Sequence, residues 1–112
     1  MSTVTLTGAQ ALVRLLQAEA VPAAFGIVGG KLAPLLHALS LSDIPFVGVR
    51  HEASAPMMAA AVFASTGRMA VALGEMGPGG LNLASGAGVA CNRRTSACAP
   101  VSVTVVDISL PA

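Results

Sequence analysis

Helical segments and short apolar runs alternate along the chain, and this alternation limits the folds that are open to it. The helical segments carry apolar residues at helical spacing, and most of the runs between them lack polar alternation, as strands buried on both faces do. The expected helices cover residues 7–20, 31–40, 53–66 and 81–90, and the expected strands cover residues 23–28, 45–49, 69–73 and 100–106. This order predicts an α/β fold, a parallel sheet of about four strands with helices on both faces.

Individual residues mark the ends of these helices. Thr7 is the expected N-cap of the first helix, and Val21-Pro22 ends it because proline disfavours helical geometry in the residue before it. Pro34 fits the second helix only in its first turn, and Gly67 is the expected C-cap of the third.

The composition indicates that much apolar surface must be covered. Of the 112 residues, 54% are hydrophobic and 10% are charged, which suits one small domain but leaves few charges for its surface. The helix over residues 53–66 is apolar nearly all the way round, as in helices buried in a larger body or an interface. We therefore expect a partner surface.

Other classes of partner do not fit. The net charge is +1 without a basic stripe, so nucleic acid is not expected. The longest uncharged run, Met76–Asn92, holds five glycines and one proline and is unlike a bilayer span. The first residues lack the regions of a secretory signal, so we expect a cytoplasmic protein. Cys91 and Cys98 match no common zinc spacing, and no metal site is expected.

Three of the expected strands end in segments that can carry chemistry. They are Gly26–Gly30, Arg50–Glu52 and the glycine-rich turn Gly74–Gly80. Ligands of open α/β sheets bind beyond the carboxyl ends of the strands. The glycines match neither a lysine-containing phosphate loop nor the dinucleotide fingerprint. Two interpretations of the glycine-rich turn stay open: an anion site at a helix start, or a tight turn.

Glu52 is the sharpest single candidate, because this acid stands at a strand end directly before an apolar helix. One interpretation is a carboxylate that faces the positive end of the helix dipole. The other is a carboxyl group in a dry cleft, where its pKa would rise and suit it to share a proton with a ligand nitrogen. A structural role is favoured over an acid–base role for His51, and Glu75 and Arg68 are expected to lie in solvent.

Four motifs follow one another in an order that a known family shares. They are residues 7–12 (TGAQAL), residues 25–30 (FGIVGG), residues 49–52 (VRHE) with the apolar helix and residues 66–68 (TGR) after them, and residues 77–83 (GPGGLNL). Together they resemble the N-terminal, pyrimidine-binding domain of thiamine-diphosphate-dependent enzymes, which include acetolactate synthase, glyoxylate carboligase, benzoylformate decarboxylase and pyruvate oxidase. The resemblance covers roughly residues 5–90.

The resemblance implies a cofactor, a reaction class and a set of site residues. Glu52 would be the catalytic residue, whose carboxyl group hydrogen-bonds the aminopyrimidine ring and favours the imino tautomer that takes the thiazolium proton. The substrate would be a 2-oxo acid, and the reaction a decarboxylation or carboligation. The residues expected to bind thiamine diphosphate are Gly29, Gly30, Glu52, Gly77, Pro78, Gly79 and Asn82. Glu75 and Met76 stand where small hydroxyl residues are usual, which leaves substrate choice open.

The same resemblance implies that a second domain, which binds the diphosphate, is needed to complete the site. Family members bind the diphosphate and Mg²⁺ through a separate domain with a G-D-G motif, which this chain lacks, and FAD, kept by some relatives, would also need another domain. We expect residues 1–90 to be a partial pyrimidine-binding domain and residues 91–112 a divergent tail, in a truncated or frame-shifted product that is inactive alone. A homo-oligomer or a diphosphate-binding partner would complete the site. The alternatives are a short natural subunit and a non-catalytic interaction module.

Overall fold

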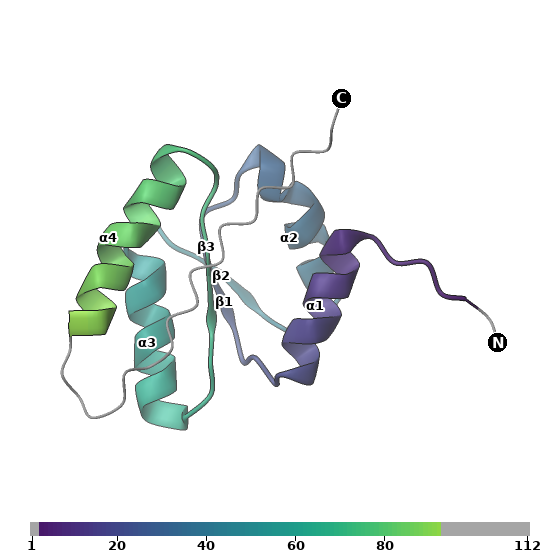
Figure 1. The fold of residues 1–112 in the computed structure, drawn as a ribbon, viewed down its shortest axis with the longest axis horizontal. Helices are drawn as coiled ribbons and strands as arrows, with labels where there is room; N and C mark the ends of the chain where they lie inside the picture. The colour runs from purple at the N-terminus through teal and green to yellow at the C-terminus, as the bar shows by residue number, and fades with distance from the viewer. Residues whose placement is uncertain (1–2, 93–112) are drawn as a thin grey trace.

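A parallel sheet between two layers of helices forms the centre of the computed structural model, which describes residues 3–92 (Figure 1). Its strands are β1 (Ala24–Gly26), β2 (Phe46–Gly48) and β3 (Val71–Leu73), in the order β2-β1-β3. β1 pairs in parallel with both neighbours, so its residues lie at the centre of the sheet. The predicted α/β class is confirmed, and the strand expected over residues 100–106 lies outside the described residues.

Helices cover both faces of the sheet. On one face lie α1 (Gly8–Ala18) and α2 (Ala33–Ser40), the latter preceded by the short 3₁₀ helix η1 (Gly30–Leu32). On the other lie α3 (Ser54–Thr66) and α4 (Pro78–Asn92), which pack against each other (Figure 1). Each helix follows a strand or leads into one, as the alternation in the sequence predicts.

The predicted helix ends are largely confirmed. Thr7 is the N-cap of α1: its hydroxyl oxygen accepts from the Gln10 amide nitrogen at 3.2 Å, and its own amide donates to the Gln10 side chain at 3.0 Å. Such a capping box satisfies two free amides of a helix start. Pro34 lies in the first turn of α2, and Gly67 caps α3 in the left-handed region with φ +71°.

The core forms two clusters, one on each side of the sheet, because successive strand residues point to opposite faces. In β1, Ala24 faces the α1–α2 layer and Phe25 faces the α3–α4 layer. Leu73 and Ala72 divide in the same way in β3. The α1–α2 cluster holds Ala9, Val13, Val21, Ala24, Leu32, Leu35, Ala38, Leu39, Ile44 and Leu73, and the α3–α4 cluster holds Phe25, Ala55, Ala59, Ala72 and Leu83.

Two details of the sequence prediction are wrong. β2 is not a buried strand: it lies at the edge of the sheet in the described part of the chain, with Phe46 half-buried and Val47 and Gly48 exposed. The glycine-rich turn is also shorter than expected, because α4 starts at Pro78 and the Gly77 carbonyl accepts from the Leu81 amide at 3.1 Å. Proline suits a first helical position because its fixed φ fits and its missing amide costs nothing there.

The apolar helix α3 is only partly covered. Ala55, Pro56 and Ala59 are buried, whereas the side chains of Met57 and Met58 are 40% and 37% exposed. Within residues 3–92, none of the helices is both long and apolar enough to span a membrane.

Candidate functional site

The segments that follow the three strands meet at one edge of the sheet, because parallel strands present their carboxyl ends on the same side. Gly29 follows β1, Glu52 follows β2, and Glu75 follows β3. Contacts across the edge join them to the first turns of α4, around the buried residue Gly79. This cluster is the candidate site.

Glu52 is held in the turn that leads into α3. Its carbonyl oxygen accepts from the Ala55 amide at 3.0 Å, and the neighbouring His51 accepts from the Ala53 amide through Nδ1 at 3.2 Å. The exposed His51 ring therefore helps to shape the turn, as the structural interpretation predicts. The Glu52 side chain is half-buried and extends towards α4.

One oxygen of the Glu52 carboxylate has a defined partner. Asn82 Nδ2 in α4 donates to Glu52 Oε2 at 3.0 Å. Among residues 3–92, no side chain donates to the other carboxylate oxygen of Glu52, Oε1. A Cβ on Gly79 would lie 3.4 Å from that oxygen, so glycine at this position keeps the space beside Oε1 open.

The environment of Glu52 lowers the pKa of its carboxyl group rather than raising it. The hydrogen bond from Asn82 holds the pKa of the Glu52 carboxyl below its ordinary value of 4.5, with smaller contributions from a backbone hydrogen bond and the nearby His51. Burial acts in the opposite direction but is outweighed. Of the two interpretations of Glu52, the carboxyl group in a dry cleft with a raised pKa therefore does not describe this chain alone, in which the side chain is half-buried.

The second acid at this edge, Glu75, does not lie free in solvent as expected. It is half-buried, and its Oε1 accepts from the Lys31 amide at 3.0 Å. Its other carboxylate oxygen occupies the space that a side chain on Gly29 would need. Glu75 thus links the turn after β1 to the turn after β3, two segments that are 44 residues apart in the sequence.

The remaining predicted site residues lie in the turns after β1 and β3 and at the start of α4, and most of them are exposed. Gly30, Gly77 and Pro78 are exposed, and Gly77 adopts the left-handed region with φ +73°. Arg68 is exposed, as expected, and donates from Nε to the Ala20 carbonyl at 3.0 Å, outside the cluster.

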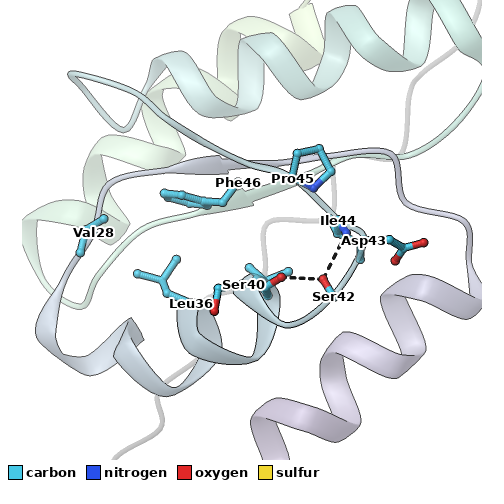
Figure 2. A pocket seen from close by; sticks show the side chains of 9 residues that line it. Val28, Leu36, Ser40, Ser42, Asp43, Ile44, Pro45 and Phe46 are labelled. Atoms are coloured by element: carbon cyan, nitrogen blue, oxygen red, sulfur yellow. Dashed lines mark hydrogen bonds between the residues drawn. The ribbon is translucent and has the colours of Figure 1, made fainter.

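A groove elsewhere in the chain lacks these residues. It has a volume of about 520 Å³ and lies between α2 and β2, where Leu36, Phe46 and Val28 form apolar walls (Figure 2). Its polar groups already have partners: Ser42 Oγ donates to the Leu39 carbonyl at 2.7 Å, and Asp43 accepts from Gln17 at 2.7 Å. The groove is lined by none of the predicted site residues, so it is not the candidate site.

A metal centre is not formed by the part of the chain that the structure describes. Within residues 3–92, no group of three or more His, Cys, Asp or Glu side chains is placed to hold a metal ion.

Comparison with known proteins identifies the family. The profile of the thiamine pyrophosphate enzyme family, N-terminal TPP binding domain, matches residues 6–99. The chain belongs to this family, thiamine pyrophosphate being another name for thiamine diphosphate.

Individual relatives agree with this assignment. The chain is 46% identical to the catabolic acetolactate synthase of Raoultella terrigena over 79 residues, which are 70% of this chain and 14% of that protein. It is 38% identical to a probable acetolactate synthase large subunit of Methanococcus aeolicus over 85 residues, which are 76% of this chain and 14% of that protein. It is 40% identical to the pyruvate oxidase of Lactiplantibacillus plantarum over 83 residues, 72% of this chain and 14% of that enzyme. The chain thus spans about 14% of the length of these relatives.

Proposed function

We propose that this chain supplies the aminopyrimidine-binding half of a thiamine-diphosphate site in an acetolactate-synthase-like decarboxylase or carboligase. The observation that carries the proposal is the Glu52 carboxylate, fixed through one oxygen by Asn82 and open at the other beside Gly79. A fixed carboxylate with an accessible oxygen suits a ring nitrogen that must be held in one protonation state. The residues present therefore fit the aminopyrimidine.

The residues of the candidate site would have different roles in binding the cofactor. Glu52 Oε1 would accept the hydrogen bond from the pyrimidine ring, while Asn82 keeps the carboxylate in place. Gly79 would let the ring approach, and Gly29, Gly30, Gly77 and Pro78 would line the rest of the site. When bound, thiamine diphosphate supplies an electron-accepting ring for the cleavage of carbon dioxide from a 2-oxo acid.

A partner is part of this proposal. The diphosphate and Mg²⁺ would be held by another domain or subunit, in a homo-oligomer or a complex of two kinds of chain. That partner would also cover Glu52 and exclude water from it, which raises the pKa of a carboxyl group. The chain would be inactive alone, in a cytoplasmic enzyme. A tail that diverges from the family from residue 91 onward is also part of this proposal.

Titration of thiamine diphosphate and Mg²⁺ against the purified chain, with and without a diphosphate-binding acetolactate synthase subunit, tests the proposal. We expect weak or no binding to the chain alone and binding to the assembly. Glu52→Gln should abolish turnover of a 2-oxo acid and leave assembly intact. Unchanged turnover in that variant would remove Glu52 from the mechanism.

A second candidate function is a non-catalytic interaction module, which is favoured by the exposed apolar side chains on α3 and α4. Leu81 is 75% exposed and Val89 is 52% exposed. Such a module would bind its partner equally well with or without thiamine diphosphate, whereas the site proposed above couples the two binding events.

A further inference from the structure

Glu75 stands out at the candidate site because its carboxylate is engaged on both oxygens by one segment of the chain. Oε1 accepts from the backbone amide of Lys31 at 3.0 Å, and Oε2 lies against Gly29. Next to it, Lys31 Nζ lies 3.7 Å from the Met76 sulfur, a second contact between the same two segments. The turn after β1 and the turn after β3 are therefore joined by side chains and not only by the sheet.

The turn after β1 needs such a partner. Gly29 is the N-cap of η1 and has no side chain with which to accept from the amides that a helix start leaves free. Glu75 supplies that acceptor from another part of the chain. A side chain on residue 29 would displace the Glu75 carboxylate, so the glycine and the acid depend on each other.

Glu75 also borders the space around Glu52. Gly79 lies between the two acids: a Cβ there would be 3.4 Å from Glu52 Oε1 and 3.7 Å from Glu75 Cβ. Glu75 therefore adjoins both Gly29 and Gly79, the two glycines that lie against carboxylates at this edge of the sheet.

We propose that Glu75 is a positioning residue of the candidate site, which fastens the turn after β1 to the turn after β3 through Lys31 and so fixes Gly29 and Gly79 around Glu52. This inference rests on the function proposed above. It deepens that function by assigning a role to an acid that neither contacts nor activates the cofactor. Its role depends on hydrogen-bond acceptance rather than on charge.

Amide hydrogen exchange at Lys31 tests the contact without any cofactor. Loss of a hydrogen bond to a carboxylate in Glu75→Ala should speed exchange of the Lys31 amide about tenfold. Glu75→Gln keeps an acceptor and should retain the slow exchange. Gly29→Ala should speed exchange of the Lys31 amide as much as Glu75→Ala does, because the added Cβ displaces the carboxylate. The double variant should exchange this amide no faster than either single variant.

Gly30→Ala is the matched control for the glycine, because a Cβ there meets nothing within 4 Å. Glu19→Ala, which removes an exposed acid at the end of α1, is the matched control for the loss of charge. Slow exchange of the Lys31 amide in Glu75→Ala and Gly29→Ala would overturn the inference.

The affinity of thiamine diphosphate with Mg²⁺, measured by calorimetry on the chain assembled with a diphosphate-binding subunit, tests the positioning role. We expect affinity about tenfold weaker in Glu75→Ala, rescued in Glu75→Gln and unchanged in Glu19→Ala. Faster Lys31 exchange with unchanged affinity would reduce Glu75 to a structural contact and overturn the role. If the wild-type assembly binds no cofactor, the proposed function fails, and the exchange results still decide whether the two turns are joined.

Discussion

The Glu52–Asn82 pair is the central feature of this chain at the scale of single residues. The two side chains lie 30 residues apart in the sequence and meet because α4 begins beside the turn that carries Glu52. The amide donates to the ionised carboxylate and therefore favours it over the protonated form. Asn82, expected to bind the cofactor directly, has a geometry that suits it to hold Glu52.

Removing the amide should raise the pKa of Glu52. In Asn82→Ala the largest cause of the lowered pKa is lost, so the carboxyl should titrate closer to 4.5. The carboxyl carbon signal in NMR, assigned with Glu52→Gln, follows this change. Gln17→Ala removes the amide that donates to Asp43 at 2.7 Å on the other layer and should leave the Glu52 titration unchanged. An unaltered titration in Asn82→Ala would show that this hydrogen bond is not formed in solution.

The same pair predicts how stability depends on pH. The pKa of Glu52 is lower in the folded chain than its ordinary value of 4.5, so the ionised group stabilises the fold above that pH. This contribution is lost as the pH falls through the folded pKa. Urea unfolding should give the wild type a larger free energy of unfolding than Asn82→Ala at pH 7. This difference in free energy should become smaller below about pH 4.5. A difference in free energy of unfolding that stays constant down to pH 2 would contradict a lowered pKa of Glu52 in the folded chain.

At the scale of elements, the contact between α3 and α4 depends on one small residue. Gly86 in α4 is buried, and a Cβ there would overlap the backbone carbonyl of Ala53, just before α3. This close approach lets α4 pack beside the turn of Glu52, which brings Asn82 within reach.

Two alanine substitutions in α4 should therefore have opposite effects. Gly86→Ala should lower the free energy of unfolding by about 1–3 kcal/mol, because backbone atoms must shift to admit the methyl group. Gly88→Ala, where the added Cβ meets nothing within 4 Å, should raise it by about 0.5–1 kcal/mol through helix propensity. Chemical denaturation measures both. Equal effects of the two substitutions would show that the close approach of α4 to Ala53 is absent.

The sequence predicts elements well and their mutual contacts poorly. Caps at Thr7 and Gly67 are local, so they can be inferred from neighbouring residues, and the strand ends that carry Gly29 and Glu52 follow from the alternation. The hydrogen bond from the Lys31 amide to Glu75 depends on how two turns that are far apart in the sequence meet, and no motif in the sequence predicts it. β2 is as apolar as a central strand, but within residues 3–92 the strand order, which local pattern does not encode, leaves it at an edge of the sheet.

At the scale of the whole molecule, the described part of the chain exposes large apolar side chains on both helical layers. Leu81 on α4 is 75% exposed and adjoins Asn82, while Leu41, which follows α2 on the other layer, is 74% exposed. The family to which the chain belongs, and its span of about 14% of its relatives, make a covering partner part of the proposal. We expect that partner to lie over the edge that holds Glu52.

These two leucines allow a matched test of which side is covered. Leu81→Gln should weaken association with a diphosphate-binding subunit about 10- to 100-fold, since an apolar side chain of this size contributes roughly 1.5–3 kcal/mol when buried. Leu41→Gln should leave association unchanged. Sedimentation or surface-based binding measures both dissociation constants. A larger effect from Leu41→Gln would place the partner on the α1–α2 layer and remove it from Glu52.

The rate at which the thiazolium C2 proton of bound thiamine diphosphate exchanges with deuterium tests the role of Glu52 most directly. It is measured by quenched-flow NMR on the chain assembled with a diphosphate-binding subunit, with no substrate present. The proposed role predicts that Glu52→Gln slows this exchange about 100-fold or more while the cofactor stays bound, because a positioned acid–base group contributes that much. Exchange as fast in Glu52→Gln as in the wild type would contradict it.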